Sequence, residues 1–197
     1  MAHFDACRFK RFENPFDMDK VEAWYEMSKE PDVWGNSEYV FNPDQLRKQT
    51  KLHGKWSDSV RAKIESLLRR EGLFSPSHSV TDVVALKSFP GCMRQPWHYD
   101  YDPAHFKGAT VACRPLGVLI ALQDGTRFHV RLPSGEEVEV LLGKGDVLVF
   151  DGGLLHAGAA YESENVRLHA YIDVSCLKRR KNMTWLVEPS CDKKIVH

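Results

Sequence analysis

The chain lacks the signatures of several protein classes. Its 197 residues contain no apolar run long enough to cross a bilayer, so we expect no membrane-spanning helix. The opening segment, MAHFDACRFKRFENPFD, has no apolar core after positive charge, so we expect no secretory signal. Lysine plus arginine and aspartate plus glutamate both number 27, so no net charge directs the protein towards nucleic acid or an anionic membrane.

Cysteine is scarce and scattered. There are five cysteines and no Cys-x-x-Cys motif, which excludes a zinc ribbon or a thioredoxin-type site. An odd number of dispersed cysteines is typical of free thiols in a reducing compartment. We therefore expect an intracellular protein, either cytoplasmic or nuclear.

Apolar residues make up 43% of the chain and charged residues 27%, as in an ordinary globular protein. Residues 1–80 are predicted to form a helical N-terminal region that packs on the core. An amphipathic helix is expected over 17–27, a second after residue 44, and a third over 57–72, which ends in glycine.

Residues 81–175 have the pattern of a β-rich core. Short apolar or alternating segments are separated by turn signals such as Pro-Gly and Asp-Gly. These segments are 81–89, 118–122, 126–132, 136–142, 146–150 and 166–174. Their spacing favours an antiparallel sandwich or barrel with jelly-roll topology. Residues 176–197 are expected to form a basic C-terminal tail, with Lys178–Lys181 as its charged cluster.

The segment His98-Tyr99-Asp100 carries the first chemical signal. In a strand, side chains alternate with period two, so His98 and Asp100 would share a face and offer two ligands to a divalent metal. A second triplet of this kind, His3-Phe4-Asp5, has no strand context and is interpreted as a chance match.

A further histidine follows a strand and a glycine turn. His156 lies 58 residues after His98, and a barrel can bring the two positions together because later strands fold back over earlier ones. Two histidines and one carboxylate on one face leave coordination positions open, which suits non-haem Fe(II) and oxygen chemistry.

Arg167 lies eleven residues after His156, in a strand otherwise rich in apolar and aromatic residues. A guanidinium on the inner face of a barrel needs an anionic partner, and it matches a carboxylate in a two-pronged pair. The alternative interpretation is an edge-strand arginine paired with Glu162, Glu164 or Asp173.

With its ordered pattern of His98, Asp100, His156 and Arg167, the chain resembles the Fe(II)/2-oxoglutarate-dependent dioxygenases. The eleven-residue gap before the arginine resembles the phytanoyl-CoA hydroxylase-like branch or a related one. The resemblance implies a double-stranded β-helix core of the jelly-roll or cupin-like kind. It also implies Fe(II) held by the first three residues, 2-oxoglutarate as cosubstrate with its far carboxylate on Arg167, and O₂. Ascorbate is a candidate additional cofactor.

Two further residues on the arginine strand are candidates for the cosubstrate pocket. By strand alternation, His169 and Tyr171 share the face of Arg167. Many members of the family carry a small hydroxyl residue two positions after the arginine, and this chain carries His169 there. The contact that such a hydroxyl makes is therefore in question.

The resemblance implies hydroxylation or oxidative demethylation of an unidentified substrate, with release of succinate and CO₂. A small molecule or a macromolecular side chain is the expected substrate. Nucleic acid is less favoured, because the AlkB-type demethylases carry a second arginine six residues after the first, where this chain has Asp173. No membrane partner is expected.

Two other functions stay open at this point. The first is a cupin-like metalloenzyme that does not use 2-oxoglutarate; its first motif requires His-x-His and a following Glu, whereas this chain has His-x-Asp. The second is a non-catalytic jelly-roll binding module with a vestigial site. The complete ligand set together with Arg167 argues against that module.

Overall fold

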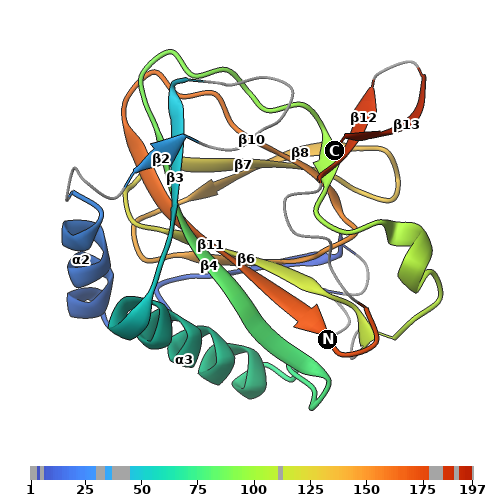
Figure 1. The fold of residues 1–197 in the computed structure, drawn as a ribbon, viewed down its shortest axis with the longest axis horizontal. Helices are drawn as coiled ribbons and strands as arrows, with labels where there is room; N and C mark the ends of the chain where they lie inside the picture. The colour runs from blue at the N-terminus through green and yellow to red at the C-terminus, as the bar shows by residue number, and fades with distance from the viewer. Residues whose placement is uncertain are drawn as a thin grey trace.

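The structure is a computed structural model, and it describes residues 4, 7–29, 34–36, 45–110, 113–177, 184–188 and 191–196. Two antiparallel sheets form its body, and two helices cover one of them (Figure 1). Within the described part of the chain, no helix is long and apolar enough to cross a membrane.

The larger sheet has seven strands, and neighbouring strands pair in antiparallel fashion. In spatial order its strands are β1 (Phe9–Phe12), β9 (Val147–Asp151), β6 (Leu116–Ala121), β11 (Asn165–Val174), β4 (His78–Ser88), β3 (Arg47–Lys51) and β2 (Gly35–Asn36). The central strand β11 is therefore paired on both sides, by β6 and by β4.

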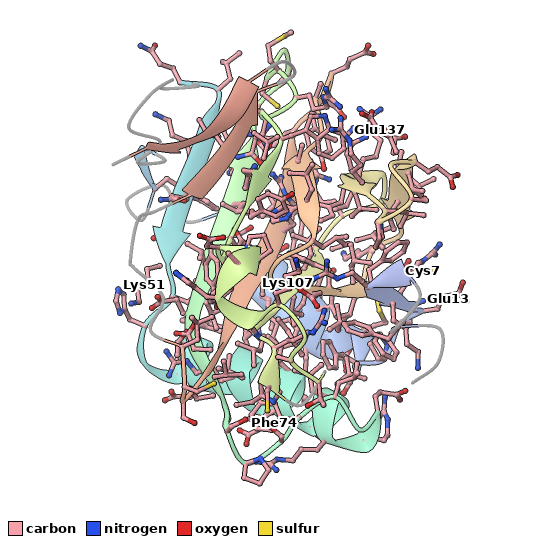
Figure 2. All side chains as sticks on the ribbon, turned by 90° about the vertical axis from the view of Figure 1, so that its right-hand side faces the viewer. Cys7, Glu13, Lys51, Phe74, Lys107 and Glu137 are labelled. Atoms are coloured by element: carbon pink, nitrogen blue, oxygen red, sulfur yellow. The ribbon has the colours of Figure 1, made fainter. Side chains whose placement is uncertain are left out.

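The smaller sheet has six strands, also antiparallel. In order they are β13 (Cys191–Val196), β12 (Thr184–Glu188), β5 (His98–Tyr99), β10 (Leu155–Gly158), β7 (Thr126–Arg131) and β8 (Glu137–Leu142). Figure 2 shows Lys51 of the larger sheet and Glu137 of the smaller one on opposite flanks of the molecule, with the mass of side chains between them. Two facing antiparallel sheets confirm the expected jelly-roll fold.

The helices form where the sequence has amphipathic periodicity. Helix α2 (Met18–Met27) buries Val21 and Trp24, and helix α3 (Gly54–Arg70) buries an apolar stripe against the sheet. After α3, Gly72 has a φ of +69°, the left-handed conformation that glycine adopts readily at a helix end. A short 3₁₀ turn, η2 (Pro103–Phe106), follows β5.

Apolar side chains fill two layers. The first lies between the helices and the outer face of the larger sheet, where Ile64 of α3 and Val118 of β6 are fully or almost fully buried. The second lies between the two sheets and includes Leu119, Phe128 and Phe150. The residues of β6 alternate between these layers, as the pleat of a strand requires.

The structure differs from the expectations in three segments. The helix expected after residue 44 is wrong, because Arg47–Lys51 forms β3, which pairs with β4 at the side of the larger sheet. The N-terminal region thus contributes strands as well as helices. The described residues of the expected tail form β12 and β13, and β12 pairs with β5. The basic cluster Lys178–Lys181 lies outside the described residues.

Candidate metal and cosubstrate site

Three predicted ligands meet between the sheets. His98 on β5 is directly opposite His156 on β10 in the strand register, and their rings lie 4.3 Å apart. Asp100 follows β5 immediately. The potential ligand atoms of the three residues all lie within 4.8 Å of one another, and all three side chains are buried. The fold therefore brings together residues separated by up to 58 positions in the chain.

Both histidines are oriented by the backbone. Nδ1 of His98 lies 2.8 Å from the carbonyl oxygen of Pro96, and Nδ1 of His156 lies 2.8 Å from that of Leu154. Because a carbonyl oxygen only accepts, each Nδ1 carries the hydrogen, and each Nε2 keeps its lone pair for a metal. Such an outer hydrogen bond is typical of histidine ligands in metal sites.

The electrostatics favour the protonation states that a metal needs. Burial, reinforced by His156, lowers the pKa of His98 to about 3, so this imidazole is neutral at neutral pH. Burial opposes ionisation of Asp100, but its neighbours His156, His169 and His98 outweigh that effect and lower the pKa of the carboxyl group. A neutral imidazole and an ionised carboxylate are ready to coordinate without first losing a proton.

The donor set fits non-haem iron. Two imidazoles and one carboxylate supply three ligands and leave positions open for cosubstrate and O₂. Among the described residues, Oδ2 of Asp100 has no hydrogen-bond partner, although it is fully buried. Phe128 and Phe150 pack against His156 with ring separations of 5.1 Å and 4.9 Å, which gives the cluster an apolar wall.

Arg167 lies deep on the inner face of β11. It is only 2% exposed, and its Nη1 lies 3.1 Å from Oγ of Ser88 and 3.5 Å from Oδ1 of Asn165. The ring of Tyr161 lies 5.4 Å from the guanidinium carbon. Nη1 of this cation thus contacts two neutral oxygens, and a guanidinium held in this way can pair with a carboxylate.

The edge-strand placement of Arg167 does not match the structure. Strand β11 has neighbours on both sides, so Arg167 is not on an edge strand. Glu164, one of its possible partners, lies 3.6 Å from Lys87. Asp173 accepts a hydrogen bond of 2.5 Å from the hydroxyl of Tyr101.

The inner face of β11 runs past the ligand cluster. Arg167 is fully buried, whereas His169, Tyr171 and Asp173 are progressively farther along the strand and partly exposed. Nε2 of His169 lies 3.6 Å from Oδ2 of Asp100, and its ring lies 4.4 Å from that of Tyr171. His169 is therefore level with the ligand cluster, with Arg167 on one side of it and Tyr171 on the other.

Sequence reasoning missed two residues of the arginine pocket. Ser88 is completely buried and lies 79 positions from Arg167 in the chain, and Asn165 is two positions before the arginine. Asn165 could have been found by strand alternation. Ser88 gave no such signal, since its role depends on the pairing of β4 with β11, where Ser88 is opposite Asn165.

No family model matches the chain, and no curated protein matches it in sequence. Solved structures do match. HygX from Streptomyces hygroscopicus, solved with nickel and 2-oxoglutarate bound, is 12% identical with a TM-score of 0.71, and the match covers 90% of this chain and 87% of that one. A prolyl-4-hydroxylase from Pseudomonas putida is 14% identical with a TM-score of 0.66, over 88% and 96% of the two chains.

A third match is SnoN, a non-haem α-ketoglutarate-dependent epimerase from nogalamycin biosynthesis, at 13% identity and a TM-score of 0.69, over 94% of this chain and 83% of that one. Identities this low establish the fold. The four-residue pattern first suggested a resemblance to the iron- and 2-oxoglutarate-dependent oxygenases. The overall fold of the chain is also similar to the folds of such enzymes. The phytanoyl-CoA hydroxylase-like branch stays a prediction.

Proposed function

We propose that the protein is an Fe(II)- and 2-oxoglutarate-dependent oxygenase that hydroxylates or oxidatively demethylates its substrate and releases succinate and CO₂. One observation carries the proposal. His98, Asp100 and His156 converge on one buried point, and the buried cation of Arg167 lies on the strand beside it. A cupin-like metal site would explain the three ligands but would not explain the buried cation of Arg167 beside them.

In this proposal, His98, Asp100 and His156 hold the iron, which supplies oxygen activation when bound. Arg167 binds the far carboxylate of 2-oxoglutarate through charge-assisted hydrogen bonds. Ser88 and Asn165 orient the guanidinium for that contact.

The rest of the site controls water and geometry. Phe128 and Phe150 exclude water from the side of His156, and the carbonyls of Pro96 and Leu154 hold the two imidazoles in place. The crystal structure of HygX with nickel and 2-oxoglutarate bound supports this assignment by analogy of fold.

The substrate is proposed to be a small molecule or the side chain of a peptide. The matched structures include HygX with hygromycin B bound and a Trichoplax adhaerens prolyl hydroxylase in complex with a peptide fragment. Substrate would approach from the Tyr171 side of the ligand cluster, because the Arg167 side is closed and is assigned to the cosubstrate.

The test combines metal binding, 2-oxoglutarate binding and succinate release without added primary substrate. His98→Ala and Asp100→Ala should lose both metal and turnover. Arg167→Ala should keep the metal and bind 2-oxoglutarate about 10²-fold more weakly, since truncating one partner of a buried charge pair costs about 2–5 kcal/mol. Arg69→Ala, on the exposed surface of α3, is the matched control and should behave as wild type.

Equal metal content and activity in all variants would refute the site. If the ligand variants fail while Arg167→Ala binds 2-oxoglutarate as tightly as wild type, the cupin-like alternative gains support. Metal binding and 2-oxoglutarate binding with no succinate release would favour the non-catalytic binding module.

A further inference from the structure

The two oxygens of the Asp100 carboxylate have different surroundings. Oδ1 lies 3.7 Å from Nε2 of His156, one of the other two candidate ligands. Oδ2 lies 3.6 Å from Nε2 of His169, and it has no hydrogen-bond partner among the described residues. A buried carboxylate oxygen that makes no hydrogen bond costs free energy, so a hydrogen-bond donor at this oxygen would stabilise the carboxylate.

The imidazole of His169 is held in position to be that donor. Its ring lies 6.0 Å from that of Phe150, inclined by 28°, and 4.4 Å from that of Tyr171. Its strand β11 is paired on both sides at this point, with Leu119 and with Val84. The strand pairing and the two neighbouring rings thus restrain the imidazole, and its Nε2 lies 3.6 Å from Oδ2 of Asp100.

We propose that His169 is a positioning residue whose Nε2–H, now 3.6 Å from Oδ2 of Asp100, moves closer and donates a hydrogen bond to that oxygen when the metal site is filled. This bond would engage one oxygen of the carboxylate and leave the other oxygen to the metal. The neutral imidazole suffices as donor. The inference rests on the proposed metal site and gives His169 a role at the metal ligand; the pocket-lining role expected from the sequence stays a prediction.

The test measures binding of Co(II) alone to the metal-free protein by its visible absorption, which reports affinity and ligand geometry without turnover. His169→Phe keeps a flat ring beside Phe150 and Tyr171 and removes the donor. We expect its affinity for Co(II) to fall about 10–100-fold, the usual effect of losing an outer partner of a metal ligand. His169→Gln places an amide N–H near the position of Nε2 and should restore affinity to within a few-fold of wild type, with the wild-type spectrum.

A matched control is His129→Phe. His129 lies on β7 with Nε2 3.3 Å from Glu139, on the outside of the smaller sheet, and the same substitution there should leave Co(II) binding unchanged. Thermal unfolding of each metal-free variant verifies that it is folded. Should His169→Phe fail to fold, His169→Leu serves as the donor-free variant.

Two results would overturn the inference. Wild-type affinity and spectrum in the donor-free variant would show that Asp100 does not need this partner. An equal loss in His169→Gln and His169→Phe would show that only the shape of the ring matters. His98→Ala separates this inference from the proposed function, because Co(II) binding that survives in His98→Ala would refute the metal site itself.

Discussion

Oγ of Ser88 on β4 lies 3.1 Å from Nη1 of Arg167 on β11, so a fully buried serine orients a fully buried cation across two neighbouring strands. We predict that Ser88→Ala weakens binding of 2-oxoglutarate about tenfold, because a hydrogen bond to a charged group contributes about 1.5–3 kcal/mol. Titration calorimetry of the nickel-loaded protein measures the change.

Metal affinity should be unaffected in Ser88→Ala, since Ser88 contacts Arg167 and none of the three ligands. Ser79→Ala, at an exposed position on the same strand, is the control and should bind 2-oxoglutarate as wild type does. Unaltered 2-oxoglutarate affinity in Ser88→Ala would show that the hydroxyl does not position the guanidinium.

Gly117 on β6 makes room for the ring of Phe150. A Cβ at this position would come within 2.2 Å of the Phe150 ring, and that ring packs against His156 and His169. Gly117→Ala is therefore predicted to destabilise the protein by about 1–3 kcal/mol, the usual cost of overpacking a core. Urea unfolding measures the loss.

The matched control is Gly143→Ala, because a Cβ there would meet its nearest neighbours at an ordinary contact distance of 3.5 Å. Gly117→Ala should also weaken Co(II) binding, since displacement of Phe150 disturbs the packing of His156. Wild-type stability in Gly117→Ala would mean that the Phe150 ring moves without cost.

Asp151 joins two segments that are far apart in the chain, one with Arg8 and one with Arg114. Its carboxylate is 2.7 Å from Arg8 and 3.0 Å from Arg114, and it also accepts a hydrogen bond from the amide of Gly153. Asp151 is 1% exposed, while the two arginine side chains are partly exposed, so we predict a loss of about 2–3 kcal/mol in Asp151→Asn. Urea unfolding of Asp151→Asn and of the exposed control Glu136→Gln measures the loss of stability. An equal loss in the two variants would contradict the prediction.

His78 should make the stability of the protein depend on pH. Burial lowers the pKa of this imidazole, which accepts a hydrogen bond from the amide of Ser75 and approaches the carbonyl oxygen of Arg114 to 2.8 Å. The unfolded chain, with a histidine pKa of about 6.5, takes up a proton that the folded chain resists. Folding therefore loses stability as the pH falls below about 6.5.

We predict that His78→Asn, which keeps an acceptor for Ser75, loses less free energy of unfolding between pH 7 and pH 5 than wild type. Urea unfolding at a series of pH values measures both curves, and their difference removes the contribution of other groups such as His98. Parallel curves would show that His78 does not contribute to the acid sensitivity.

The ligand set could be found from sequence because each member lies in a local pattern. His98 and Asp100 are related by strand alternation, His156 follows a strand and a glycine turn, and Arg167 is a charge in an apolar strand. The structure places the three ligands within 4.8 Å of one another and buries Arg167.

What could not be predicted depends on pairing between distant strands. The segment Arg47–Lys51 has no apolar residue and becomes a strand only because β4 offers it a hydrogen-bonding edge. The role of Ser88 depends on the pairing of β4 with β11 in the same sheet. The approach of His169 to Asp100 depends on the packing of the two sheets, since β5 and β11 belong to different sheets. Local periodicity carries no information about such contacts.

The groups that orient His98 and His156 are main-chain carbonyls, each two positions before the histidine it holds. Every amino acid possesses such an oxygen, so the orientation of both rings depends on the path of the backbone and not on a polar side chain at Pro96 or Leu154. A redesign that preserves the course of β5 and β10 could therefore replace much of the surrounding sequence and still present two imidazole nitrogens to the same point.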